Sequence, residues 1–236
     1  MISKGELSTI YKDCYFEESN SNIIISEQNP NDISKDLQEL TITGLRGTYL
    51  KISPKWLNDS IEPYNAVWHN YKLFRRDCDS IILLNHDGQN YIIWIELKSS
   101  FNEVLKTALF QIVGSYMRSK SYLNAFSTFK QEDYKELSII ASHPINEQSS
   151  TDGNTVVIDN KKLFTGKDKD KNLLLAQKYR RKLKVGGSLM IIEGTDFDLD
   201  QLPLESSVVL TKLPLVHLEA NGISLSVDIN TIVKKV

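Results

Sequence analysis

Three residues whose side chains can bind a metal ion and act on a phosphate lie close together in this sequence. Asp79 begins one apolar run, and Glu96 and Lys98 stand at the end of the next. Carboxylate oxygens are the ligands that suit Mg²⁺ and Mn²⁺, and such ions bridge to phosphate oxygens. A neighbouring lysine can position the attacking water or offset charge that develops on the phosphate. These residue types indicate metal-assisted phosphate chemistry, provided that the fold brings them together.

The two apolar runs, residues 79–85 and 91–98, have the composition of a β-hairpin. An Asp-Gly pair between them is a strong signal for a two-residue turn. With that pair at the centre of the turn, Asp79 lies opposite Glu96, and Glu96 and Lys98 project from the same face because side chains alternate along a strand. The hairpin therefore predicts that all three side chains converge, whereas a slip of one residue would separate them.

Further elements are expected around the hairpin. Apolar residues recur at helical spacing from Phe101 to Tyr116, after capping-box chemistry at residues 100–103, which predicts a helix to about Arg118. A short helix is predicted for residues 32–40, with Glu39 on it, and strands for residues 48–52 and 137–141. The succession of strands and helices indicates an α/β or α+β fold.

An Asp before one strand, Glu-x-Lys on the next strand and an amphipathic helix after it resemble the PD-(D/E)xK nuclease superfamily. Restriction endonucleases, Holliday-junction resolvases and RecB-type nucleases belong to it. The resemblance covers about residues 32–143 and departs from the literal motif in having no proline before Asp79. It implies that Asp79 and Glu96 are metal ligands and that Lys98 is the catalytic lysine. It also implies a restriction-endonuclease-like core, with a central mixed β-sheet flanked by helices, and an Mg²⁺ or Mn²⁺ cofactor.

The same resemblance suggests further site residues. RecB-type members carry a glutamine and a tyrosine four residues apart in the helix after the motif; Gln111 fits the first position, but Ser115 occupies the second. Gln111 is therefore a candidate catalytic residue, and a buried structural amide is the alternative. Some members take another metal ligand from their first helix, for which Glu39 is the first candidate and Glu62 the second.

A strongly basic segment lies in the last third of the chain. Residues 161–184 contain ten lysines or arginines and two aspartates, a local charge of +8 in a chain of net charge −2. Such a segment can hold a phosphate backbone, and a tyrosine within it can stack on a base. A solvated helix face or a loop is the alternative. The residues expected to contact nucleic acid are Lys178, Tyr179, Arg180, Arg181, Lys182 and Lys184.

The composition of the chain is that of an ordinary globular protein, with 236 residues, 41% hydrophobic and 25% charged. Its two cysteines, without CxxC spacing, argue against a zinc ribbon or a disulfide-stapled secreted domain. There is no signal-peptide pattern and no apolar run that could cross a bilayer, so we expect a cytoplasmic location and no membrane partner. Residues 1–150 are expected to form the nuclease-like domain, and residues 151–236 a β-rich region with the basic segment.

Two functional hypotheses follow from these observations. The first is a metal-dependent nuclease that hydrolyses phosphodiester bonds, with DNA as the expected substrate and a role in restriction, phage defence or mobile-element biology. The second is a catalytically inactive scaffold of the same kind that binds nucleic acid or takes part in an assembly. Retention of the Asp, Glu and Lys favours the first. Endonuclease or exonuclease action, strand form and homodimer formation stay open.

Overall fold

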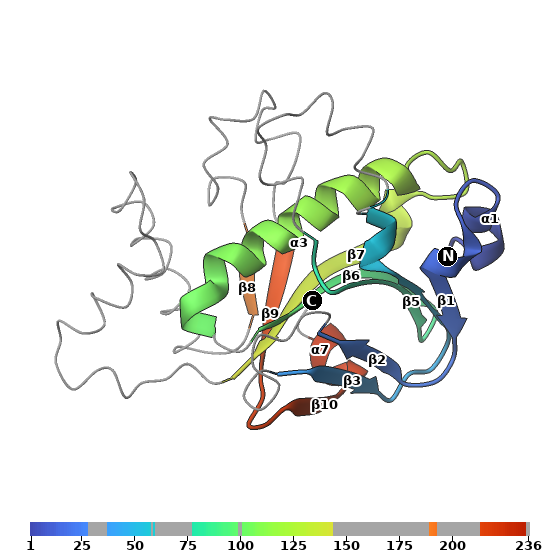
Figure 1. Ribbon diagram of the computed structural model, residues 1–236. Helices are drawn as coiled ribbons and strands as arrows, with labels where there is room; N and C mark the ends of the chain where they lie inside the picture. The colour runs from blue at the N-terminus through green and yellow to red at the C-terminus, as the bar shows by residue number, and fades with distance from the viewer. Residues whose placement is uncertain are drawn as a thin grey trace, which may run out of the picture.

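The computed structural model describes residues 1–27, 37–57, 59, 77–98, 101–143, 189–192 and 213–234, with the backbone alone described for 101–107 and 189–192. It is a mixed α/β structure with a central mixed β-sheet and flanking helices (Figure 1), as expected from the sequence. The expected domain boundary near residue 150, the basic segment and Glu62 lie outside the described residues. None of the described helices is long and apolar enough to cross a bilayer.

The central sheet has seven strands in the order β1-β4-β5-β6-β7-β9-β8. The β6–β7 and β7–β9 pairs are parallel, and the other neighbours are antiparallel. The strands are β1 (Phe16–Ser19), β4 (Tyr49–Ile52), β5 (Ser80–His86), β6 (Gln89–Lys98), β7 (Tyr134–Ser142), β8 (Leu189–Ile192) and β9 (Leu213–Glu219).

A second sheet of three strands, in the order β10-β3-β2, packs against one face of the central sheet. Its strands are β2 (Ile23–Ser26), β3 (Glu39–Thr43) and β10 (Ser224–Asp228), and β10 leads into helix α7 (Ile229–Val233). Because β9 and β10 pair with β7 and β3, the end of the chain contributes strands to both sheets.

The helix predicted for residues 32–40 is wrong at its C-terminal end, because Glu39 and Leu40 lie in β3; residues 32–36 lie outside the described residues. In β3, Leu40 and Ile42 are buried while their neighbours are half-buried, which is the period of a strand with one face on the core. Pairing with β2 on one side and β10 on the other overrides the weak helical pattern of this short segment.

The hairpin prediction is confirmed in its register. Ser80 pairs with Ile95 and Ile81 with Trp94. Asp87 and Gly88 have φ angles of 51° and 78°, so both central turn residues are left-handed, as a type I′ turn requires. Since the register is set by this turn, the position of every side chain on β6 relative to β5 is fixed by local sequence.

Helix α3 (Phe101–Leu123) runs along the other face of the central sheet (Figure 1) and is longer at its C-terminal end than the sequence pattern indicates. Its Leu109 and Ile112 are buried, as expected, against a cluster that includes Ile92 and Trp94; the Leu105 side chain lies outside the described residues. The indole N–H of Trp94 donates to Ser119 Oγ on the helix (3.0 Å). Both faces of β5 and β6 are therefore covered, which explains their unbroken apolar sequences.

Short helical segments precede β1 and β7. They are α1 (Lys4–Ser8), which begins with a capping box between Ser3 and Glu6, and the 3₁₀ segments η1 (Asp13–Tyr15) and η3 (Gln131–Asp133). Residues 54–57 are also helical.

Candidate active site

The structure brings Asp79, Glu96 and Lys98 together at the open end of the β5–β6 hairpin. Asp79 directly precedes β5, and its Oδ2 accepts a hydrogen bond from the backbone N–H of Leu97 (2.6 Å). The Lys98 ammonium forms an ion pair with Glu96 Oε1. Glu96 and Lys98 share the parity of Trp94, so they project towards the face that α3 covers.

Burial makes this cluster electrostatically costly. Glu96 is 0% exposed and Asp79 is 8% exposed, while the Lys98 side chain is 16% exposed. Within the part of the chain that the structure describes, the Lys98 ammonium compensates the Glu96 carboxylate by contacting Oε1, and no donor reaches Oε2. An ionised carboxylate taken from water in this way is unfavourable unless a further cation or proton joins it.

The pKa values of the cluster express this cost. Burial, and then the charge of Glu27, raises the pKa of Asp79 to about 7 against the opposing effects of the Leu97 N–H and Lys98. Burial, followed by the charge of Asp79, raises the pKa of Glu96 well above its ordinary range. Burial acts to lower the pKa of Lys98, but the surrounding carboxylates outweigh it and raise that pKa. Among the described residues, the site therefore has more acidic groups than the Lys98 ammonium can neutralise.

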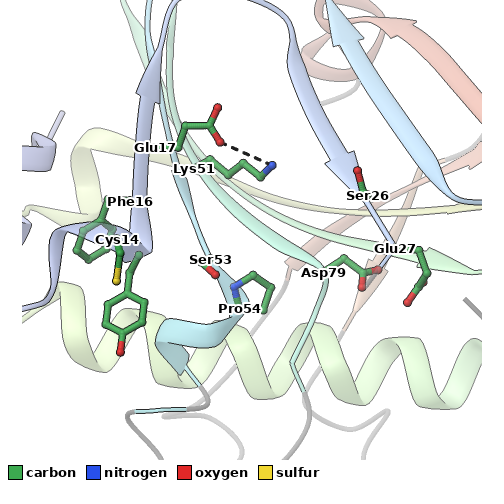
Figure 2. Close-up of a pocket in the computed structure, with 10 residues that line it drawn as sticks. Cys14, Phe16, Glu17, Ser26, Glu27, Lys51, Ser53, Pro54 and Asp79 are labelled. Carbon is green, nitrogen blue, oxygen red and sulfur yellow. Dashed lines mark ion pairs between the residues drawn. The ribbon is translucent and has the colours of Figure 1, made fainter. Parts of the chain in front are cut away.

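Glu27 is a site residue that the sequence interpretation missed. It directly follows β2, and Figure 2 shows its side chain beside that of Asp79. Its charge acts on Asp79, Glu96 and Lys98. An acid at the end of a short isoleucine-rich strand is the same local signal that singled out Glu96, but nothing local indicates that β2 ends near β5.

Glu39, the first candidate for a further metal ligand, takes a different place. It begins β3 opposite Ser26, and its Oε1 accepts a hydrogen bond from the Thr41 hydroxyl (3.3 Å). It thus stands beside the strand that leads into Glu27, and Glu27 is the acid whose charge acts on the cluster. The expectation that Glu39 reaches the site from a helix is wrong, because the residue lies in a strand.

The polar groups of the cluster fit a hard divalent cation. No group of three His, Cys, Asp or Glu side chains among the described residues forms a complete cage for a metal ion. Mg²⁺ does not require one, since it usually keeps several waters and binds proteins through one or two carboxylates. Asp79 and Glu96 supply such a pair, and Glu96 Oε2 has no hydrogen-bond donor among the described residues.

Three side chains of α3 hold the segment that leads into Asp79. Gln111 Nε2 donates to the Asp77 carbonyl (2.9 Å), and Ser115 Oγ accepts from the Cys78 N–H (2.9 Å). The Arg118 guanidinium forms an ion pair with the Asp77 carboxylate. The structure thus places Gln111, a candidate catalytic residue, as a support of the segment before β5. Its Oε1 is buried and accepts no hydrogen bond from the described residues.

A cleft of about 360 Å³ opens beside Asp79. Figure 2 shows Asp79 and Glu27 at one end of it, and Cys14 with the aromatic residues of the η1–β1 segment at the other. Cys14 is exposed and Cys78 is buried, and both are free thiols. Asp79 and Glu27 therefore line a hollow that the N-terminal residues help to build.

The residues expected to contact nucleic acid, Lys178 to Lys184, lie outside the described residues. Comparison with known proteins gives no relative: no protein-family model matches the chain, and neither a curated protein nor a solved structure matches it.

Proposed function

We propose that this protein is a metal-dependent nuclease that hydrolyses phosphodiester bonds, with DNA as its expected substrate. The observation that carries the proposal is the state of Glu96. Its carboxylate is fully buried next to a second buried acid; the Lys98 ammonium contacts Oε1, and no described residue donates a hydrogen bond to Oε2. A divalent cation shared with Asp79 would compensate both charges, which a single ammonium cannot do.

The residues take distinct roles in this proposal. Asp79 and Glu96 hold Mg²⁺ or Mn²⁺, and Glu27 is a further acid near enough to influence them. The ion, when bound, lowers the pKa of a bound water and offsets charge on the phosphate. Lys98 keeps its proton at neutral pH because the surrounding acids raise its pKa, so its ammonium can orient the water or stabilise charge that develops on the phosphate.

The arrangement of elements supports the resemblance to the PD-(D/E)xK superfamily. The motif residues lie on the hairpin β5–β6, helix α3 follows, and β7 returns parallel to β6. We propose a restriction-endonuclease-like core on this basis. A role in restriction, phage defence or mobile-element biology follows from the same resemblance.

One observation favours the alternative of an inactive scaffold that binds nucleic acid. The Lys98 ammonium already contacts Glu96 Oε1, an oxygen that a metal ion would use. An inactive protein would keep this ion pair permanently. In an active protein the metal ion must share Glu96 Oε1 with the Lys98 ammonium or displace that ammonium. The two functions differ in whether added metal ions bind and support cleavage.

The direct test is incubation of the purified protein with plasmid, single-stranded DNA and RNA in Mg²⁺, Mn²⁺ or EDTA. We expect cleavage of at least one substrate with a divalent ion and none in EDTA. Asp79→Asn is the matched control, because it removes a ligand charge while keeping the size of the side chain. Equal cleavage by wild type and Asp79→Asn would assign the activity to a contaminant, and no cleavage under any condition would favour the scaffold.

Contact of the basic segment with the substrate is a separate part of the proposal. Replacing Arg180, Arg181 and Lys182 together by glutamine should weaken nucleic-acid binding at all sequences. It should also reduce the slope of log affinity against log salt by about one unit per lost phosphate contact. Unchanged affinity and slope would mean that these side chains face solvent.

A further inference from the structure

The cleft beside Asp79 is large enough to receive part of a substrate. Its volume of about 360 Å³ is at the lower end of the range for small-molecule sites and gives room for one nucleotide, not for a base pair. Figure 2 shows Ser53 and Pro54 between the acidic end, with Asp79 and Glu27, and the end at Cys14. A group that enters the cleft therefore lies next to Asp79, one of the two proposed metal ligands.

The charges on its walls determine what the cleft can bind. Among the described residues, three acids line it, Glu17, Glu27 and Asp79, and one lysine, Lys51. The Lys51 ammonium is already engaged, because it donates to the Ile24 carbonyl (2.6 Å) and lies 3.9 Å from the Glu17 carboxylate. This excess of acceptors repels a phosphate and favours an uncharged group that carries N–H donors.

We propose that this cleft binds the unpaired base of the nucleotide next to the scissile phosphate, with a preference for bases that carry an exocyclic amino group. The proposal rests on the proposed nuclease function. Carboxylates accept hydrogen bonds from the amino group of cytosine, and serine hydroxyls serve either polarity. Glu17, Glu27, Ser26 and Ser53 supply these groups on the walls. Thymine, which has no amino group, fits this lining less well.

A cleft of this size can bind a base only when that base is unpaired. Single strands and unpaired ends present such a base at no cost, whereas a duplex must first unstack and unpair it at a cost of about a few kcal/mol. The cleft therefore favours single-stranded or frayed nucleic acid over an intact duplex.

Alkylation of Cys14 measures occupancy of the cleft without a metal ion and without cleavage. Cys14 is exposed on the cleft wall, while the only other thiol, Cys78, is buried. In EDTA, deoxycytidine at millimolar concentration should slow the reaction of wild type with N-ethylmaleimide several-fold, and thymidine should slow it less, as measured by mass spectrometry. Cys14→Ser controls for reaction at Cys78. Equal rates with and without deoxycytidine would overturn the proposal.

Filling the cleft tests its part in substrate choice. Ser26 is an exposed residue of β2 whose side chain lines the cleft, and Ser226 is an exposed residue of β10, in the same three-stranded sheet but away from the cleft. Ser26→Trp should reduce cleavage of single-stranded DNA by about tenfold or more, a loss of at least about 1.4 kcal/mol in transition-state binding. Ser226→Trp should cleave as wild type does, and the two variants should unfold at similar temperatures.

The two proposals fail in different ways. If wild type cleaves nucleic acid but Ser26→Trp cleaves single strands equally well and Cys14 is not shielded, the nuclease stands and the base site is wrong. If wild type cleaves no substrate but deoxycytidine still shields Cys14, the base site stands and the nuclease is wrong.

Discussion

Two lysine–glutamate pairs lie on the same face of the central sheet, towards opposite ends of β6 and β7. The Lys98–Glu96 pair lies at the end of β6, at the open end of the β5–β6 hairpin. The Lys120–Glu136 pair joins α3 to the start of β7 (2.8 Å between Nζ and Oε1). Lys120 Nζ also donates to Tyr116 Oη (2.8 Å) and lies 4.6 Å from the centroid of the Tyr116 ring.

The pairs differ in how well their polar groups are satisfied. Around Lys120 the ammonium has two acceptors and an aromatic face, and the partly exposed Glu136 can still reach water. Around Glu96 a second buried acid adds negative charge; the Lys98 ammonium contacts Oε1, and no described residue donates a hydrogen bond to Oε2. A structural ion pair needs a complete set of hydrogen-bonding partners. An acidic group at the end of a sheet whose set of partners is incomplete is instead suited to bind an added cation.

Removing each glutamate in turn tests whether the two ion pairs differ in function. Glu96→Ala should lower cleavage by about a thousandfold or more, because a metal ion supplies several kcal/mol of transition-state stabilisation and each 1.4 kcal/mol is about a factor of ten. Glu136→Ala should leave the rate per folded molecule unchanged. Initial rates on the preferred substrate, normalised to the folded fraction, provide the measurement.

Thermal unfolding separates loss of the metal from loss of chemistry. Mg²⁺ at ten times its Kd should stabilise wild type and Glu136→Ala by about 1.4 kcal/mol, and Glu96→Ala not at all. Equal stabilisation of all three proteins would place the ion elsewhere.

Replacing the two lysines should also affect cleavage unequally, with the larger loss at Lys98, but by a smaller factor than replacing the glutamates. Lys98→Ala should reduce cleavage by about a hundredfold to a thousandfold, the usual result of removing one group that stabilises transition-state charge. The stabilisation by Mg²⁺ should persist, because Lys98 is not a metal ligand. Lys120→Ala should cleave at the wild-type rate. Loss of the Mg²⁺ effect in Lys98→Ala would mean that the lysine is needed to hold the acids in place.

The hairpin could be predicted from sequence because its signals are local. Residues 87 and 88 need left-handed backbone angles, which an Asp-Gly pair supplies, and the turn then sets the register that brings Asp79 and Glu96 to one end. The unbroken apolar runs on either side agree with a strand that is covered on both faces. The acid–lysine cluster followed from these features alone.

Glu27 and β3 could not be predicted in this way, because their positions depend on partners far along the chain. β3 is a strand because β2 and β10 pair with it, and β10 follows it by well over a hundred residues. The sequence of residues 32–40 has a weak helical periodicity, and this local pattern favours a helix because it carries no information about the distant strand partners. The sequence predicts that Gln111 lies on the helix after the hairpin, but its hydrogen bond to Asp77 depends on tertiary packing.

The two glutamates should also differ in their contribution to the free energy of unfolding, by a few kcal/mol. Glu136→Ala leaves the Lys120 ammonium buried without its carboxylate, and breaking a buried pair costs about 3–5 kcal/mol. Since these side chains are 11% and 16% exposed, we expect a loss of about 3 kcal/mol or slightly less in the free energy of unfolding. Glu96→Gln in EDTA at pH 8 should not lower it, because the amide carries no charge to bury. Urea unfolding measures both, and a larger loss for Glu96→Gln would show that its ion pair is structural.

The pH dependence of stability gives the smallest expected effect. Burial raises the pKa of Asp79 from 3.8 to about 7, so its stabilising contribution is fully present below pH 3.8 and is lost as the pH rises through about 7. Between pH 5 and 8 in EDTA, wild type should therefore lose about 2.5 kcal/mol relative to Asp79→Asn. Glu136→Gln, which leaves the Asp79 cluster intact, should keep the wild-type pH dependence. Saturating Mg²⁺ should reverse the loss at pH 8, because the ion binds the deprotonated carboxylates. Parallel curves for wild type and Asp79→Asn would show that Asp79 is ionised throughout this range and that the cluster already has the cation it needs in Lys98.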